Sequence, residues 1–347
     1  MENSSCPLIF DDQQIITLAH GSGGKHTSRL LEQIFLPAFS NTYLDLLHDG
    51  ALLNIPKNQI VFSTDSYVVQ PVFFPGGDIG KLAVTGTLND LAMCGAKPYY
   101  LSCGFIIEEG FLQADLKRIV DSMKYEANAN SVHIVTGDTK VIERQTGANI
   151  FINTSGIGIS MVDYPIHPRQ IKPGDAILLS GDIGRHGMAV MAKRESLEFS
   201  SPLISDCASL VPLVAALLNQ GITVHCLRDL TRGGLATAIV ELSETANMDF
   251  FIEEETISVG EAVNSACEIL GFDPLYVANE GRFIAFVPQH QASEALKILQ
   301  NYPEGAQANI IGHVIGASSS PSAALKNSFG TERYLYKLVG DQLPRIC

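Results

Sequence analysis

Residues 81–98 read KLAVTGTLNDLAMCGAKP, and their apolar side chains recur at the spacing of a helix. This periodicity predicts a helix with one face against a hydrophobic core, and Gly95 and Pro98 are expected to end it. Asn89 and Asp90 form a polar pair within this otherwise apolar segment. Burial of a carboxylate is costly unless a cation lies beside it. We therefore expect Asp90 to meet either a Lys or Arg side chain or a metal ion.

Two further isolated carboxylates follow apolar runs that are predicted to be strands. Asp65 follows residues 60–64, and Asp138 follows residues 132–137. Together with Asp90 they could converge on Mg²⁺, which prefers oxygen ligands and keeps phosphate oxygens among its partners. Spacing alone favours three separate structural carboxylates, each paired with Lys or Arg. Both interpretations stay open at this point.

The composition bounds the class of protein. A chain of 347 residues is long enough for two domains of ordinary size. With 46% hydrophobic and 17% charged residues, it can bury a sizeable core. A formal net charge of −14 argues against nonspecific nucleic-acid binding and against an anionic membrane surface. An anionic ligand such as ATP would need Mg²⁺ and locally placed cations.

Cysteine usage and the absence of apolar runs point to a cytoplasmic protein. The first residues, MENSSC, lack the basic region and apolar core of a signal peptide. No apolar run approaches the ~20 residues that a membrane span requires. The seven cysteines include no Cys-x-x-Cys pair, which favours a reduced compartment over a disulfide framework or a zinc site.

A glycine-rich segment, HGSGGKH at residues 20–26, is the first unusual feature of the chain. Gly23 and Gly24 permit close backbone approach to a ligand, their N–H groups can form an anion-binding nest, and Lys25 adds a positive charge. The spacing matches neither a P-loop nor a Rossmann turn. Phosphate binding and a flexible surface loop both stay open.

Alternating strand and helix patterns predict an α/β protein with two domains. We assign residues 1–165 to the first domain and 166–339 to the second, because a proline-rich connection, residues 165–174, lies between them. In the first domain, strands are expected at residues 60–64, 99–107, 132–136 and 149–160, and a helix at 110–127. In the second, strands are expected at 176–180, 223–225, 249–252, 275–278, 282–287 and 309–315, and helices at 188–193, 208–219, 234–246, 260–270 and 290–302.

Polar clusters interrupt the pattern of the second domain at residues 184–187, 228–234 and 279–281. The cluster at 228–234, RDLTRGG, precedes a predicted helix, where backbone N–H groups attract an anion. Thr231 or Asp229 could equally be an ordinary helix cap. For the cluster that contains Glu280, a tight turn between two strands is the simpler interpretation.

The chain ends in GDQLPRIC, residues 340–347. A terminal cysteine is ordinarily just an exposed thiol, and no Cys lies four residues from the end to make a prenylation box. About eight residues can span up to ~26 Å. The thiol of Cys347 could therefore enter a site elsewhere in the protein.

Several segments together carry a resemblance to a known family: residues 20–25, 63–69 (STDSYVV), 74–80 (FPGGDIG), 86–92 (GTLNDLA), 135–140 (VTGDTK), 231–234 (TRGG), 278–281 (ANEG) and 343–347 (LPRIC). They resemble the HypE family, the carbamoyl dehydratases of nickel–iron hydrogenase maturation. That family belongs to the superfamily of aminoimidazole-ribonucleotide synthetase, selenophosphate synthetase and thiamine-phosphate kinase. The terminal LPRIC is the most specific signal, because the related kinases and synthetases lack it. Departures at Arg185, Leu230 and residues 329–331 concern ligand contacts of the second domain.

The resemblance implies a two-domain fold of the aminoimidazole-ribonucleotide synthetase type, α/β or α+β in class. An ATP-binding and dimerising N-terminal domain is followed by a C-terminal α/β domain and by a flexible tail, residues 340–347, that carries the substrate. The implied activity is the ATP-dependent dehydration of a carbamoyl group on the Cys347 thiol to a protein thiocyanate. The thiocyanate supplies the cyanide ligand of the hydrogenase iron.

The same resemblance assigns roles to individual residues. ATP and Mg²⁺ are expected at Asp65, Asp90 and Asp138, with Asn89 helping, and the loop of Gly23, Gly24 and Lys25 is expected to cover the phosphates. Lys140 and Glu280 match positions implicated in proton removal in the family, so they are the expected catalytic groups beside Cys347.

The resemblance also implies partners: a second copy of the chain in a homodimer, the carbamoyltransferase HypF, and the HypC–HypD complex as cyanide acceptor. Two alternatives stay open. A kinase or synthetase of the same superfamily would act on a free small molecule and would not need Cys347. A non-catalytic scaffold for hydrogenase assembly would need neither the three aspartates nor Lys140.

Overall fold

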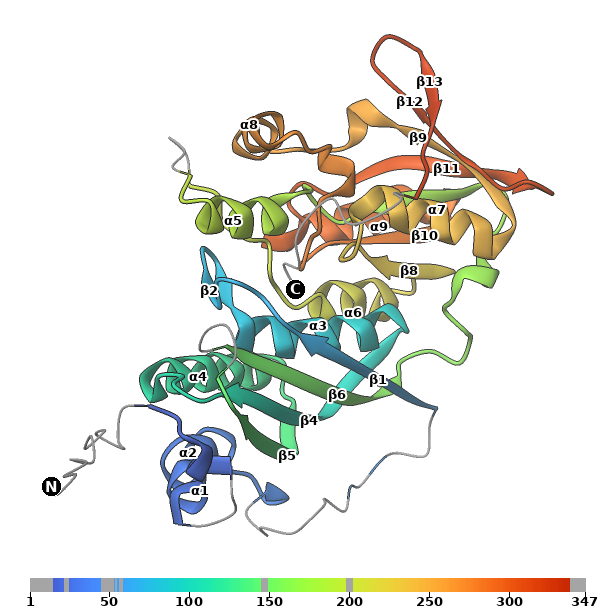
Figure 1. Cartoon of the computed structure of the whole chain (residues 1–347). Coiled ribbons are helices and arrows are strands. Elements are labelled where there is room, and N and C mark those ends of the chain that lie inside the picture. The colour runs from blue at the N-terminus through green and yellow to red at the C-terminus, as the bar shows by residue number, and fades with distance from the viewer. Residues whose placement is uncertain are drawn as a thin grey trace, which may run out of the picture.

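The computed structural model has two large sheets, each flanked by helices, that meet along one central helix (Figure 1), and a two-stranded sheet of β2 (Phe73–Phe74) and β3 (Gly77–Asp78). The structure describes residues 15–21, 25–44, 53, 55, 59–144, 149–197 and 202–337. A small helical unit opens the described chain; it consists of α1 (Lys25–Leu30), a π-helical turn (Leu31–Phe35) and α2 (Leu36–Phe39).

The first sheet has four strands in the order β1-β6-β4-β5. Their bounds are Ile60–Tyr67 for β1, Ile150–Ser160 for β6, Ala96–Glu108 for β4 and His133–Ile142 for β5. The pairs β1–β6 and β6–β4 are antiparallel, whereas β4 and β5 are parallel and are joined by the helix α4 (Gln113–Ala129). The expected strands and helix are therefore present, with β1, β4 and β5 longer than expected.

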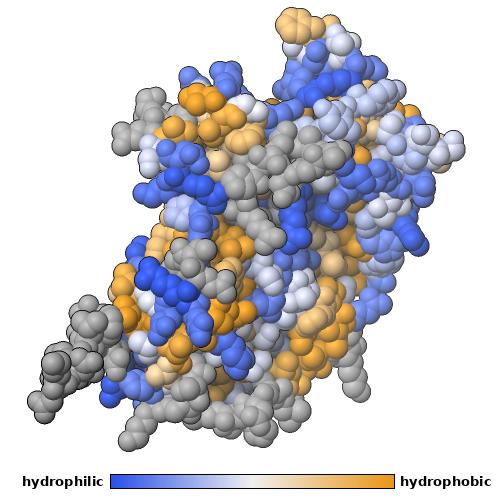
Figure 2. Space-filling view, viewed as in Figure 1, coloured by the Kyte–Doolittle hydropathy of each residue, from blue (hydrophilic) through white to orange (hydrophobic). Residues whose placement is uncertain are grey.

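One face of this sheet carries the helices and the other is open. Thr154 on β6 contacts Thr87 on α3 (Ile79–Met93) at 2.6 Å, so the row of residues that includes Thr154 faces the helix. On the open face, Ile60 (56% exposed), Phe62 (65%) and Ile106 (45%) leave apolar surface in contact with solvent. Figure 2 shows apolar colouring on the first domain, in the part of the view where Figure 1 places β1 and β6.

Helix α3 is the element predicted from residues 81–98, and it is the centre of the molecule. It is buried along nearly its whole length because it packs on β1, β6 and β4 and also contacts the second domain through α6 and β8. Asp78 caps it by accepting hydrogen bonds from the backbone N–H groups of Gly80 and Lys81. The helix ends before Gly95, whose φ of 70° suits glycine, whereas Pro98 lies within β4.

The second sheet has seven strands in the order β13-β12-β9-β11-β7-β10-β8. Their bounds are Asp175–Leu179 (β7), Cys226–Asp229 (β8), Met248–Glu253 (β9), Phe283–Pro288 (β10), Asn309–Ala317 (β11), Ala323–Lys326 (β12) and Glu332–Tyr334 (β13). Helix α7 (Gly234–Ala246) packs on one face, and α6 (Val211–Asn219) and α9 (Ala292–Gln300) pack on the other. Helices α5 (Arg185–Arg194) and α8 (Glu261–Leu270) lie toward the first domain's side of the core.

Two expectations for the second domain were wrong, and two strands were not expected. Residues 275–278 are not a strand: Leu275 and Tyr276 belong to a 3-10 turn, Pro274–Tyr276, that Asp273 caps by accepting from the Leu275 N–H. The strand expected at 223–225 lies three residues later, as β8. Strands β12 and β13 were not expected, because they are short and the segment before them is rich in serine.

The two sheets draw on separate parts of the chain, and residues 161–174 connect them. The division at residue 165 stays a prediction. Across the described ranges, no helix has both the length and the hydropathy of a membrane span.

Candidate active site

A cleft of about 1260 Å³ lies between the two domains. It is bordered by β1 and the end of α3 from the first domain, and by the β8–α7 connection and the segment before β10 from the second. The polar groups that line it include Ser63, Asp65, Tyr67, Asp90, Arg228, Asp229, Arg232, Glu241, Glu280 and Lys337. Three of the residues predicted from separate motifs, Asp65, Asp90 and Glu280, thus line one cavity at the domain junction.

Asp65 and Asp90 both line this cleft. Asp90 Oδ2 accepts a hydrogen bond of 2.6 Å from Ser63 Oγ, and Asp65 Oδ1 lies 3.4 Å from Arg232 Nη2. Burial raises the pKa of Asp90, the nearby charge of Asp65 raises it further, and the Ser63 hydrogen bond opposes both effects. Asp65 and Asp90 therefore form a pair of carboxylates that a bound cation would stabilise. The expectation that Asp90 meets a cation or a metal ion rests on this pair.

Asp229, at the end of β8, was missed as a site residue. It was considered only as a helix cap, but α7 starts after Gly233, which has a φ of 70°, and no side chain caps it. The capping interpretation was therefore wrong. Burial, then the charge of Asp90, raises the pKa of Asp229 to about 7. A carboxylate directly after an apolar strand pattern, the signal used for Asp65, could have found it.

Two arginines bring positive charge to the same wall. Arg228 Nη2 lies 2.7 Å from Glu241 Oε2, and Arg232 makes the ion pair with Asp65 described above. Both side chains remain well exposed and line the cleft. They are the locally placed cations that a strongly acidic chain needs in order to bind an anion.

Glu280 is 4% exposed and lines the cleft from the second domain. Its charge, with those of Asp65 and Asp90, acts on the phenol of Tyr67, whose pKa is raised well above its usual value mainly by burial. The Tyr67 hydroxyl lies 3.2 Å from Thr87 Oγ1. Glu280 and the first-domain carboxylates thus line the same cleft and both act on Tyr67.

Asp138 and Lys140 lie elsewhere. Both are on β5, the far edge of the first sheet, where Lys140 Nζ is 3.4 Å from Asp138 Oδ2 and the two side chains are 65% and 71% exposed. Three strand spacings separate β5 from β1, about 14 Å. Asp138 belongs to the row with Gly104 and Asn153, on the open face of the sheet.

The three aspartates therefore do not converge within one chain. Asp65 pairs with Thr154, in the row that faces α3, so it points to the opposite side of the sheet from Asp138. No group of three His, Cys, Asp or Glu side chains that could hold a metal occurs among the described residues. The expectation that the three aspartates converge is therefore wrong for a single chain, because the strand order places Asp65 and Asp138 on opposite edges of the sheet.

Asn89 connects the domains. Its amide nitrogen donates to the Ala208 carbonyl at 3.1 Å and to the Glu280 carbonyl at 3.4 Å, and its oxygen accepts from the Leu210 N–H at 2.7 Å. The side chain is 3% exposed. Its hydrogen-bonding groups are thus engaged by the second domain, and a contact with the nucleotide stays only a prediction.

Several predicted site residues lie outside the part of the chain that the structure describes. Gly23, Gly24 and Cys347 belong to this group; Lys25 opens α1, but its side chain is outside the described set. The last described residue, Lys337, lines the cleft, and its Nζ lies 2.6 Å from Glu244 Oε2. Tyr276 Oη donates to the Tyr336 carbonyl at 3.0 Å. The last described residues, Tyr336 and Lys337, therefore lie at the cleft.

The donor set fits ATP with Mg²⁺. Mg²⁺ is commonly bound by one or two carboxylates, with water and substrate phosphates completing its shell. Asp65 and Asp90 supply the two carboxylates, and Arg228 and Arg232 supply charges for phosphate oxygens. Asp229 adds a third carboxyl group beside Asp90.

The chain is similar to proteins of known activity. The N-terminal domain of AIR synthase related proteins matches residues 47–160, and the C-terminal domain matches residues 172–321. Carbamoyl dehydratase HypE of Azotobacter vinelandii is 46% identical over 332 residues, 96% of this chain and 97% of that protein. The crystal structure of hydrogenase maturation protein HypE in complex with ATP superposes with a TM-score of 0.92 at 44% identity, covering 95% of this chain and 99% of that one. HypE in a HypE–HypF complex superposes with a TM-score of 0.77 at 46% identity, covering 89% and 99%.

Proposed function

This chain belongs to the HypE family of carbamoyl dehydratases within the AIR synthase-related proteins, and we infer that it dehydrates a carbamoyl group with ATP during hydrogenase maturation. The observation that carries this inference is the meeting of Asp65, Asp90 and Glu280 in the cleft that Lys337, the last described residue, also lines. The site thus has groups for binding a nucleotide and for proton removal.

The proposed substrate is the S-carbamoyl group on Cys347 of the protein itself. The carboxamide oxygen attacks the γ-phosphorus of ATP, and ADP leaves. The carbon–oxygen bond then breaks with loss of phosphate, and the nitrogen gives up its two protons as the carbon–nitrogen triple bond forms. Phosphorylation is needed because an unmodified amide oxygen is a very poor leaving group. The product is a protein thiocyanate.

Nucleotide binding is assigned to residues from both walls of the cleft. Asp65 and Asp90 would hold Mg²⁺, which when bound neutralises charge on the phosphates during transfer. Arg228 and Arg232 would contact phosphate oxygens. Gly23, Gly24 and Lys25 would cover the phosphates, as the resemblance implies.

Proton removal is assigned to Glu280, which lies in the cleft and is shielded from bulk solvent. Lys140 is assigned a second role in proton transfer or in neutralising the transferred phosphoryl group. Because Lys140 and Asp138 lie at the far edge of their own sheet, we propose that they serve the cleft of a partner subunit.

A homodimer would make this possible. The open face of the first sheet exposes Ile60, Phe62 and Ile106, and it also carries Asp138 and Lys140. Stacking of two such faces would bury the apolar residues and bring the β5 edge of one chain toward the β1 side of the other. The active site would then be shared between the two subunits.

Two protein partners complete the proposal. HypF, which forms a complex with the similar HypE, would load the carbamoyl group, and a HypC–HypD complex would accept the cyanide.

The alternative, a kinase or synthetase for a free small molecule, predicts turnover without Cys347. Incubation with the carbamoyltransferase, carbamoyl phosphate and ATP, followed by peptide mapping, separates the two. Wild-type protein should carry the modification on Cys347 only. Normal turnover by Cys347→Ala would favour the alternative.

A further inference from the structure

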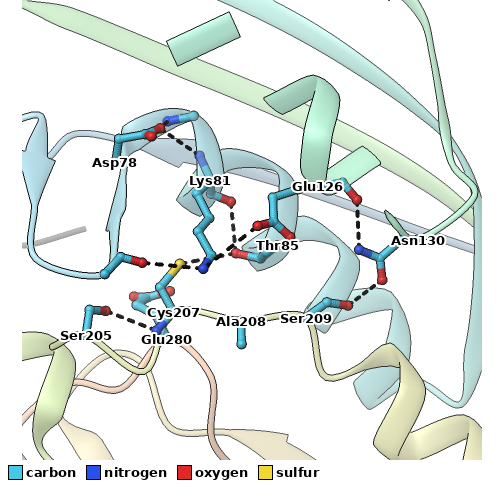
Figure 3. Close-up of polar contacts among 12 residues, drawn as sticks. Asp78, Lys81, Thr85, Glu126, Asn130, Ser205, Cys207, Ala208, Ser209 and Glu280 are labelled. Carbon is cyan, nitrogen blue, oxygen red and sulfur yellow. Dashed lines mark hydrogen bonds and ion pairs between the residues drawn. The ribbon is translucent and has the colours of Figure 1, made fainter. Parts of the chain in front are cut away.

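We propose that Asp206 is a positioning residue that holds Glu280 in its reactive place, an inference that rests on the role assigned to Glu280 above. Asp206 lies in the connection before α6, between the two domains, and belongs to none of the sequence motifs. Figure 3 shows its neighbours Ser205, Cys207 and Ala208 beside Glu280, next to the part of α3 that carries Lys81 and Thr85.

The contact is between a carboxylate and the backbone of the catalytic turn. Asp206 Oδ2 accepts hydrogen bonds from the N–H groups of Glu280, at 3.2 Å, and of Gly281, at 3.0 Å. Asp206 is 4% exposed, so water screens these charge-assisted bonds little. One carboxylate oxygen therefore fixes two consecutive peptide groups at the residue that must remove a proton.

The turn is held on its carbonyl side as well. The Glu280 carbonyl accepts from the Ala208 N–H at 3.4 Å and from Asn89 Nδ2 at 3.4 Å. Asn89 precedes Asp90 on α3. The same hydrogen bonds thus join Glu280 to α3, the helix that carries the proposed metal ligand Asp90. They set the distance between the proposed base and the proposed metal site.

Close packing leaves the connection no room to shift. A Cβ added to Gly281 would lie 1.9 Å from the Asp206 carbonyl oxygen, which only glycine permits. On the other side, Ser205 Oγ accepts from the Cys207 N–H at 3.0 Å and lies 2.9 Å from His186 Nδ1. Thr85 Oγ1 lies 3.5 Å from Cys207 Sγ (Figure 3). Asp206 is therefore held from both domains.

Only one of the two carboxylate oxygens of Asp206 makes this contact. Asp206 Oδ1 is buried and has no hydrogen-bond partner among the described residues. A buried, half-satisfied charge costs stability that a neutral amide would not. An amide oxygen can also accept the hydrogen bonds from the N–H groups of Glu280 and Gly281, so Asp206→Asn is the conservative variant. Asp206→Ala removes the contact.

The test measures dehydration in a single turnover on protein already carbamoylated at Cys347, after addition of ATP and Mg²⁺. Asp206→Ala should slow dehydration by about 100-fold, because a displacement of ~1 Å at a reacting group has that effect. Asp206→Asn should recover most of the rate, to within about 5-fold of wild type. Both variants should bind ATP with unchanged affinity. Asp175→Asn, a buried aspartate that contacts His225 at 2.8 Å in the same domain, is the matched control and should leave the rate unchanged.

A double substitution separates positioning from general damage. If Asp206 acts only through Glu280, adding Asp206→Ala to Glu280→Gln should cost nothing further. An equal additional loss in that background would overturn the inference, as would a wild-type rate for Asp206→Ala or no recovery in Asp206→Asn. A wild-type rate for Glu280→Gln alone would instead show that the proposed base is wrong.

Discussion

Ser63 Oγ donates a hydrogen bond of 2.6 Å to Asp90 Oδ2, and it thereby ties strand β1 to helix α3 at the wall of the cleft. The bond favours the ionised form of a carboxylate whose pKa burial raises. A partner of this kind orients a metal ligand and increases its charge at neutral pH.

Ser63→Ala should therefore weaken Mg²⁺-dependent ATP binding by roughly 10-fold while leaving the fold intact. Titration calorimetry with and without Mg²⁺ measures this. Ser243→Ala is the matched control, because Ser243 also makes a buried hydrogen bond, to the Met248 carbonyl at 2.7 Å, but lies away from the cleft. Equal affinities for wild type and Ser63→Ala would remove Asp90 from the metal site.

The ionisation of Asp229 should lower the free energy of unfolding as the pH rises. Its folded pKa of about 7 lies above its usual 3.8, so between these values the folded state binds more protons than the unfolded state. Folding then loses stability as the pH rises, by up to roughly 4 kcal/mol in total. Asp229→Asn should remove this loss and stabilise the ligand-free protein more at pH 8 than at pH 4.

Urea unfolding at the two pH values tests this, with Asp121→Asn on the exposed face of α4 as the control. A change of equal size at both pH values would show that Asp229 ionises as an ordinary surface aspartate.

Ile106→Glu should separate the dimer. Ile106 is 45% exposed on the open face, and a charge buried there in an interface would be strongly unfavourable. Light scattering coupled to size exclusion should report dimers for wild type and monomers for the variant. Tyr125→Glu, on α4 and 71% exposed, should stay dimeric. A monomeric wild type at micromolar concentration would contradict the proposed dimer.

A heterodimer of one Asp90→Asn chain and one Asp138→Asn chain should regain about half of the wild-type activity. In a shared site, each cleft takes Asp90 from one subunit and Asp138 from the other, so one of the two clefts is intact. Two different affinity tags allow the heterodimer to be purified. If Asp138 served its own chain, neither cleft would be intact and no activity would return.

The local elements could be predicted from sequence because their signals are local. The apolar periodicity of α3 and the strand before Asp65 correctly placed two carboxylates on the elements that border the cleft. The open position of Asp138 could not be foreseen, because it depends on the order in which strands pair. Sequence order alone does not specify which edge of the sheet β5 occupies.

The missed residues were those whose role depends on contacts between domains. Asn89 was predicted beside the metal, but its amide binds the backbone at Ala208 and Leu210 from the second domain. Asp206 has no motif around it, and its partner is 74 residues away in the chain. Such contacts follow from packing, and no periodicity or spacing reports them.

The most direct test of the central claim is a single-turnover measurement of intact mass on protein carbamoylated at Cys347. On addition of ATP and Mg²⁺, the wild-type chain should lose the mass of one water molecule from the modified tail peptide, because the amide becomes a nitrile. Glu280→Gln should remain carbamoylated while still binding ATP, because its base is removed. Dehydration of Glu280→Gln at the wild-type rate, or loss of mass from a peptide other than the tail, would contradict the account.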